Sequence, residues 1–269
     1  MMFTYLLFGV FLVGLILIMV RIEKIFSFKK GFPILMYHKI SENYADSLTI
    51  TVKELERQLK YLKDNDYKCL SFTDLKHYYN KHEPIPAKSV IITFDDGYLN
   101  NKIYLLPILE RLGMKATIFL PVSFIGKVNV WDSGNEIIMD LNTVKEIIKF
   151  SYVELGIHSY KHQNYNELTM NEIENDIQLC NEFIEKNKLD IVKVITYPYG
   201  GTLRKNPDLN SKMKEILEYK GYWFGLRIGN RLNNIHLKDV FELFRIDIKG
   251  TDSYLKFKIK IKIGRIKLF

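Results

Sequence analysis

The chain has 269 residues, of which 47% are hydrophobic, and a formal net charge of +8 at pH 7. A chain of this length and composition can bury one sizeable core, so we expect a single domain with at most an appendage. Its two cysteines, Cys69 and Cys180, have no CxxC spacing, which argues against a disulfide framework and against a cysteine metal cluster.

The positive charge is concentrated near the two ends of the chain. Segments 21–32 and 256–269 are rich in lysine and arginine, whereas the residues between them are close to neutral overall. A nucleic-acid-binding protein should instead carry its positive charge along a folded face. We therefore expect no nucleic-acid partner, and we expect the basic ends to lie against an anionic surface. Nothing in the sequence indicates an oligomer.

The first twenty residues contain no charged side chain. At about 1.5 Å per residue, a helix over 1–20 approaches the thickness of the hydrocarbon core of a bilayer. A cleaved signal peptide is the alternative, but its usual basic start and small-x-small cleavage site are absent. We expect an uncleaved membrane anchor followed by a basic juxtamembrane linker over 21–32. The positive-inside tendency then favours a cytoplasmic location for the downstream domain.

The rest of the chain alternates between short apolar runs and segments with helical spacing. Alternating strands and helices predict a parallel sheet, and the commonest closed form of such a sheet is a barrel. We therefore expect an α/β barrel domain over 33–255. Strands are predicted at 33–37, 90–94, 116–121, 153–157, 191–197, 222–227 and 242–248, and helices at 51–65, 74–80, 99–112, 142–150, 170–188 and 206–220.

The last segment, 256–269, alternates lysine with apolar residues every second position. This period is typical of an amphipathic edge strand, or of a segment that lays its apolar side on a bilayer with lysines among the headgroups. A disordered basic tail is the third interpretation.

Polar residues with catalytic potential lie where several apolar runs end. His38 follows the first run, Asp95 and Asp96 follow the second, and His158 and Pro198 follow later ones. In parallel barrels the carboxyl ends of the strands meet on one face, where active sites form. We therefore expect these residues to share a site, although an Asp-Asp-Gly sequence taken alone also fits a surface turn.

Two histidines, His158 and His162, are four residues apart. On a helical turn these positions share a face, so both imidazoles could bind one ion. Together with a carboxylate from another strand end, they would form a site of two histidines and one carboxylate, with open positions for water and substrate. Two exposed loop histidines are the alternative. The Trp131-Asp132 sequence, in an earlier segment, predicts either a loop that borders a substrate groove or a buried tryptophan next to a turn.

Three motifs occur in order along the chain: TFDDGY at 93–98, HSYKH at 158–162 and YPYG at 197–200. Together they resemble the successive motifs of the polysaccharide deacetylases, carbohydrate esterase family 4, also called the NodB-homology domain. The resemblance extends over 33–248. It implies a distorted (β/α)7 barrel and a metal-dependent hydrolase that deacetylates carbohydrate.

The resemblance also implies a role for each motif residue. Asp96, His158 and His162 would bind a divalent metal, with Zn²⁺ as the first expectation and Co²⁺, Ni²⁺ or Fe²⁺ as alternatives. Asp95 would be the general base that takes a proton from a water acidified by the ion. The side chains of adjacent strand residues diverge, which makes this division between Asp95 and Asp96 physically reasonable.

The YPYG motif would stabilise the oxyanion that forms when hydroxide attacks the acetamide carbonyl. The backbone N–H of Tyr199, just after Pro198, is the expected donor. Tyr98 and Tyr199 are further expected to stack on sugar rings, with packing inside the fold as the alternative for each.

The chain departs from the usual family pattern at two positions. Thr196 stands where most members have an arginine that pairs with the base, and the late Leu-x-His motif of the general acid is missing. The sequence PILMYH at 33–38 resembles a circularly permuted subgroup, the deacetylases of biofilm poly-N-acetylglucosamine. By this resemblance His38 would be the general acid. The late sequence LFRID at 243–247 resembles a strand of the same subgroup, so that Arg245 would replace the missing arginine beside Asp95. An ordinary salt bridge at a strand end is the alternative for Arg245.

The sequence therefore predicts a membrane-anchored deacetylase that removes N-acetyl groups from N-acetylglucosamine-containing polysaccharide at or near the cell surface. The family resemblance favours an extracytoplasmic catalytic domain, against the positive-inside tendency. Peptidoglycan deacetylation and O-acetyl removal are alternative activities, and a glycan-binding member of the fold without catalytic activity is a third.

Overall fold

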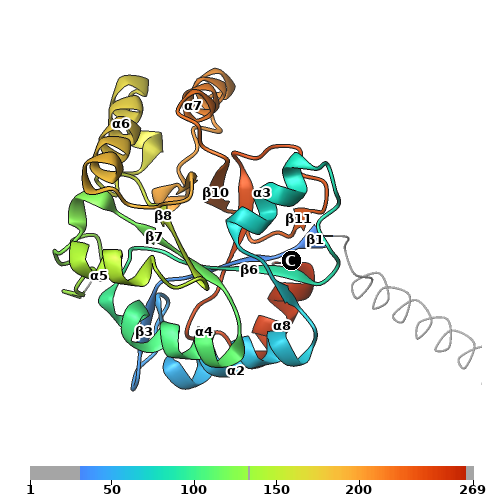
Figure 1. The fold of residues 1–269 in the computed structure, drawn as a ribbon. Helices are drawn as coiled ribbons and strands as arrows, with labels where there is room; N and C mark the ends of the chain where they lie inside the picture. The colour runs from blue at the N-terminus through green and yellow to red at the C-terminus, as the bar shows by residue number, and fades with distance from the viewer. Residues whose placement is uncertain (1–30, 133, 265–269) are drawn as a thin grey trace, which may run out of the picture.

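The computed structural model describes residues 31–132 and 134–264. Its helices surround a closed barrel of parallel strands (Figure 1). The expected membrane anchor over 1–20 lies outside the described residues, as does most of the basic linker. Within the described ranges, no helix combines the length and the apolar character needed to span a bilayer.

Seven strands form the barrel, and neighbouring strands in the ring are parallel. The first of them, β2, closes the ring because it pairs with both β6 and β12. The structure therefore confirms the predicted seven-strand parallel barrel. The barrel strands are β2 (Ile34–Tyr37), β6 (Ser89–Phe94), β7 (Ala116–Leu120), β8 (Val153–Ile157), β9 (Val194–Thr196), β10 (Phe224–Ile228) and β12 (Leu243–Asp247).

Shorter strands flank the barrel. Strand β5 (Lys68–Cys69) pairs with the first residues of β6. Strands β3 (Lys39–Ser41) and β4 (Thr49–Thr51) form a separate parallel pair directly after β2. Strand β1 (Gly31–Phe32) pairs with β11 (Asn233–Asn234) in antiparallel orientation.

The interior of the barrel changes from apolar to polar along its axis. Ile91 of β6 and Phe119 of β7 belong to a buried cluster with Phe72, the first residue of helix α3 (Phe72–Asn80). The Phe72 ring lies 5.9 Å from the Phe119 ring. Because side chains alternate along a strand, Ile91, Thr93 and Asp95 point to the same side. The apolar cluster therefore gives way to polar side chains toward the carboxyl ends of the strands.

The helices cover the outside of the barrel and begin at side chains that cap them. Thr51 accepts a hydrogen bond from the Glu54 amide at 3.2 Å. Thr169 and Glu172 form a capping box at the start of α6. The helices are α2 (Val52–Asp64), α3 (Phe72–Asn80), α4 (Leu106–Leu112), α5 (Leu141–Ile147), α6 (Met170–Asn187), α7 (Pro207–Tyr219) and α8 (Tyr254–Ile263).

The helix predicted over 99–112 is interrupted. A π-helical turn over Asn101–Leu105 precedes α4, which ends at Gly113 with φ of 64°. The turn is held by the buried Asn101 side chain, whose Nδ2 donates to the His38 carbonyl oxygen at 2.9 Å. It therefore ties the start of this helix to the chain just after β2.

The interpretation of the basic tail as an edge strand is wrong, because residues 254–263 form helix α8. Ser253 caps the helix by accepting the Lys256 amide at 3.2 Å. Phe257 and Ile261, four residues apart, are buried in the main core. The Lys260 ammonium contacts the buried Asp252 carboxylate. Helical burial of one apolar pair thus outweighs the period-two pattern of the sequence.

If α8 is an integral part of the domain, its buried ring should contribute strongly to stability. We expect Phe257→Ala to lower the free energy of unfolding by about 3–5 kcal/mol, because it removes a fully buried aromatic ring. Leu255→Ala on the same helix, where the side chain is 64% exposed, should change it by less than about 0.5 kcal/mol. Urea denaturation of both variants measures the difference, and equal effects would show that α8 is not part of the cooperative core.

Candidate active site

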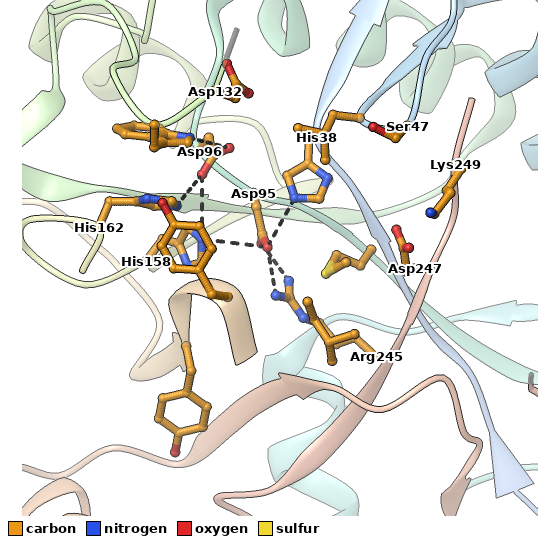
Figure 2. Close-up of a pocket in the computed structure, with 16 residues that line it drawn as sticks. His38, Ser47, Asp95, Asp96, Asp132, His158, His162, Arg245, Asp247 and Lys249 are labelled. Carbon is orange, nitrogen blue, oxygen red and sulfur yellow. Dashed lines mark hydrogen bonds and ion pairs between the residues drawn. The ribbon is translucent and has the colours of Figure 1, made fainter. Parts of the chain in front are cut away.

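The carboxyl ends of the barrel strands enclose a cavity of about 350 Å³. Figure 2 shows side chains from several strand ends converging on it. The structure thus brings together residues that lie far apart in the sequence. The sequence-predicted residues that line the cavity are His38, Asp95, Asp96, His158, His162, Tyr199 and Arg245.

The two adjacent aspartates diverge because the chain turns sharply after β6. Asp96 and Gly97 both have left-handed backbone conformations, with φ of 71° and 61°. A Cβ atom at position 97 would approach the Leu120 side chain to 2.5 Å and would be strained by the left-handed backbone, so this turn favours glycine. As a result Asp95 faces Arg245, whereas Asp96 faces the two histidines (Figure 2).

Asp95 forms a bidentate ion pair with Arg245. The Nη1 and Nη2 atoms of Arg245 donate to Oδ1 and Oδ2 of Asp95 at 2.6 and 2.7 Å, and both side chains are almost fully buried. Burial alone would raise the pKa of Asp95, but the guanidinium and then His158 outweigh it, and the pKa lies below its usual range. Asp95 is therefore held ionised in a fixed orientation.

Asp96, His158 and His162 form a compact group whose ligand atoms all lie within 4.8 Å of one another. The Oδ1 atom of Asp96 is 3.2 Å from Nε2 of His162 and 3.5 Å from Nε2 of His158. All three side chains are buried. Burial lowers the pKa of His158 to about 4, so its imidazole is neutral at pH 7.

This group fits a divalent metal ion. Neutral imidazoles and an ionised carboxylate are the usual donors for zinc and related ions. Among the described residues, the buried Oδ1 atom of Asp96 has no hydrogen-bond donor. A buried carboxylate oxygen is costly to leave in this state, and a bound cation would satisfy it.

The tautomer of His158 is fixed by Thr196. Nδ1 of His158 lies 2.9 Å from the Thr196 carbonyl oxygen, which can only accept a hydrogen bond. The Thr196 hydroxyl lies 2.6 Å from the same nitrogen. Nδ1 therefore carries the proton, and Nε2 is left free as a ligand. Sequence reasoning missed this role, since it identified Thr196 only as the position of an absent arginine.

A loop between β7 and α5 covers the metal-ligand group. The Trp131 ring stacks on His162 with centroids 4.0 Å apart, and its Nε1 atom donates to Oδ2 of Asp96 at 3.3 Å. The next residue, Asp132, pairs with the buried ammonium of Lys39 at 2.8 Å. Of the two interpretations of Trp131-Asp132, the structure therefore supports a loop that borders the cavity.

His38 lies on the other side of Asp95 from the metal-ligand group (Figure 2). Its Nε2 atom is 4.0 Å from Oδ2 of Asp95. The Asn101 side chain holds the His38 carbonyl, as described above. The cavity thus presents one carboxylate flanked by an imidazole on one side and a cluster of metal-ligand type on the other.

The residues considered for substrate contact differ in exposure. Tyr199 is 58% exposed beside the cavity and has a left-handed backbone, with φ of 57°. Its backbone N–H is not a donor in any of the turn and loop hydrogen bonds to backbone oxygens within residues 31–132 and 134–264. The expectation that Tyr98 stacks on a sugar is wrong, because this ring is fully buried and its hydroxyl lies 3.4 Å from Asp132. Pro198 is also buried, and it is the first residue of the short helical turn Pro198–Gly200 that contains Tyr199.

The Asp95–Arg245 pair should make a large contribution to stability. We expect Arg245→Met to lower the free energy of unfolding by about 3–5 kcal/mol, because it leaves a buried carboxylate without a partner. The exposed Arg111–Glu56 pair, at 2.7 Å, is the matched control, and Arg111→Met should cost less than about 1 kcal/mol. Chemical denaturation of metal-free protein tests both. If Arg245→Met lowered the free energy of unfolding no more than Arg111→Met, the claim that the buried Asp95–Arg245 pair contributes strongly to stability would be wrong.

Comparison with known proteins identifies relatives of this barrel. The sequence profile of the polysaccharide deacetylases matches residues 82–223. A putative polysaccharide deacetylase of Bacillus subtilis, YxkH, is 30% identical over 194 residues, which cover 72% of this chain and 63% of that protein. A poly-beta-1,6-N-acetyl-D-glucosamine N-deacetylase of Staphylococcus aureus is 27% identical over 61% of this chain and 58% of its own length. The chain thus spans less than two thirds of either relative.

Solved structures share the fold. IcaB from Ammonifex degensii superposes with a TM-score of 0.71 at 19% identity, covering 86% of this chain and 97% of that one. A Streptococcus pyogenes deacetylase, PplD, solved in complex with acetate, gives 0.68 at 20% identity, covering 86% and 98%. At these identities the likeness concerns the fold. With the sequence match over more than half of its length, the chain belongs to the polysaccharide deacetylase family.

Proposed function

We propose that this protein is a metal-dependent hydrolase that removes N-acetyl groups from an N-acetylglucosamine-containing polysaccharide. One observation carries the proposal. A carboxylate held ionised by Arg245 lies in the same cavity as a buried Asp/His/His group, with His38 on its other side. A barrel that had kept only glycan binding would have no need to bury these charges together.

The metal would be held by Asp96, His158 and His162. Two imidazoles and one carboxylate leave further coordination positions open, as catalytic zinc sites require, and Zn²⁺ is therefore the first candidate. When bound, such an ion supplies Lewis acidity that lowers the pKa of water and polarises a carbonyl group. Thr196 holds the His158 ring through its carbonyl oxygen. Trp131 stacks on His162 and donates a hydrogen bond to Asp96.

Asp95 and His38 would divide the proton transfers. Asp95 is ionised and would take a proton from the attacking water, while Arg245 fixes the orientation of its carboxylate. His38, on the opposite side of Asp95, would give a proton to the nitrogen as the C–N bond breaks. The N–H of Tyr199 would donate to the oxyanion of the tetrahedral intermediate. Water and the acetamide are thereby converted to acetate and a free amine.

The substrate is inferred from the relatives. Several of them are named poly-beta-1,6-N-acetyl-D-glucosamine N-deacetylases, and we propose the same class of acetylated glycan here. The uncharged segment 1–20 supports an anchor in the membrane, and we propose that the catalytic domain lies outside the cytoplasm near that surface. A polymer at the cell surface would be accessible to a domain in this position.

The proposed reaction is tested with β-1,6-linked N-acetylglucosamine oligomers. We expect acetate and free amine to form in equal amounts with added Zn²⁺ or Co²⁺, and a chelator to abolish both. Oligomers that also carry O-acetyl esters test the alternative, since acetate released from them without a matching amount of amine would show O-deacetylation. No acetate from any acetylated glycan would contradict the enzymatic function and favour a binding module.

Substitutions of His38 and Asp95 test the assignments of the general acid and the general base. We expect Asp95→Asn and His38→Ala each to lower kcat by about 10²–10⁴-fold, the usual contribution of general acid–base groups. His236→Ala, which removes an exposed histidine outside the cavity, should leave kcat within about twofold. If His38→Ala retained full turnover while Asp95→Asn abolished it, the assignment of His38 as the acid would be wrong.

A further inference from the structure

The turn that carries both histidine ligands is strained. Ser159 and His162 have φ of 60° and 55°, a left-handed conformation that residues other than glycine adopt at an energetic cost. The Ser159 hydroxyl oxygen accepts the His162 amide at 2.8 Å and closes the turn locally. A strained turn persists only when its surroundings hold it, so other contacts must fix the peptides between His158 and His162.

Those contacts come from Asp176, on the inner face of helix α6. The Tyr160 amide lies 3.0 Å from both carboxylate oxygens of Asp176, and the Lys161 amide lies 3.2 Å from Oδ2. The Tyr165 hydroxyl donates to Oδ1 at 2.8 Å. Hydrogen bonds to a carboxylate are stronger than those between neutral groups. One side chain thus holds two consecutive peptides of the four that join the ligand residues.

The position of Asp176 is unusual for a carboxylate. Its neighbours on the buried stripe of α6 are Ile173, Ile177 and Cys180, and Asp176 itself is only 5% exposed. Within the part of the chain that the structure describes, none of the ion pairs formed by lysine, arginine or histidine includes Asp176. A buried carboxylate needs hydrogen-bond donors, and its donors here are the Tyr165 hydroxyl and the turn itself.

We propose that Asp176 is a positioning residue that presets the turn from His158 to His162 and thereby sets the affinity of the metal site. The inference rests on the proposed function, since it assumes that the two histidines bind a metal. Asp176 acts from outside the cavity and touches neither the ligand atoms nor the substrate. Without it, the Tyr160 and Lys161 amides would lose their acceptor, and the turn would relax toward less strained conformations that separate His162 from Asp96.

The test compares the zinc affinity of the full chain and its variants by competition with a chromophoric chelator. Asp176→Asn keeps the shape of the side chain but removes its charge, and we expect the dissociation constant for Zn²⁺ to rise about 10–100-fold, as for other residues that orient metal ligands. Asp176→Glu, which retains a carboxylate, should recover part of this loss. Glu174→Gln removes the same charge from an exposed position on α6 and should leave the affinity unchanged.

The outcomes separate this inference from the proposed function. If wild-type protein binds no divalent metal, the proposed function and the inference both fail. If wild-type protein binds zinc and a folded Asp176→Asn variant binds it equally well, Asp176 supports only the fold, and the inference alone is overturned.

A second measurement uses wild-type protein and does not depend on the folding of any variant. In metal-free protein, we expect the amide protons of Tyr160 and Lys161 to exchange slowly with solvent, because Asp176 already holds them. Free exchange that becomes slow only when zinc is added would show that the metal organises the turn. That result would overturn the inference.

Discussion

The buried ion pair between Asp95 and Arg245 is the constraint on which the site depends. Two adjacent and almost fully buried carboxylates follow strand β6, and ionised groups are costly to bury without compensation. The guanidinium of β12 compensates Asp95 through two parallel hydrogen bonds. This leaves Asp96 to be compensated separately, beside the two histidines. The pair also joins strand ends on the two sides of β2, where the ring closes.

The remaining side chains of the site are held from several directions by groups outside it. Thr196 fixes the ring of His158 from the end of β9, and Trp131 packs on His162 from a loop that Lys39 anchors through Asp132. A site arranged in this way needs little reorganisation when charge develops during a reaction. The same organisation explains why left-handed residues cluster here, since the surrounding contacts offset their strain.

Much of this arrangement follows from local sequence. Strand ends, helix caps and the divergence of Asp95 and Asp96 are short-range features, and the motif pattern pointed to Arg245 as the partner of Asp95. The roles of Thr196 and Asp176 depend on contacts between distant segments, although a carboxylate within the apolar stripe of α6 was a visible signal. Helix α8 was missed because its alternating pattern also fits a strand, and burial of Phe257 decided between the two.

The most direct test of the account is zinc K-edge X-ray absorption on protein loaded with one equivalent of Zn²⁺. The account predicts a first shell of two imidazole nitrogens with oxygen donors, and the loss of this shell in an Asp96→Asn variant. A spectrum with fewer than two imidazoles, or one left unchanged by Asp96→Asn, would contradict the convergence of Asp96, His158 and His162 on a single ion.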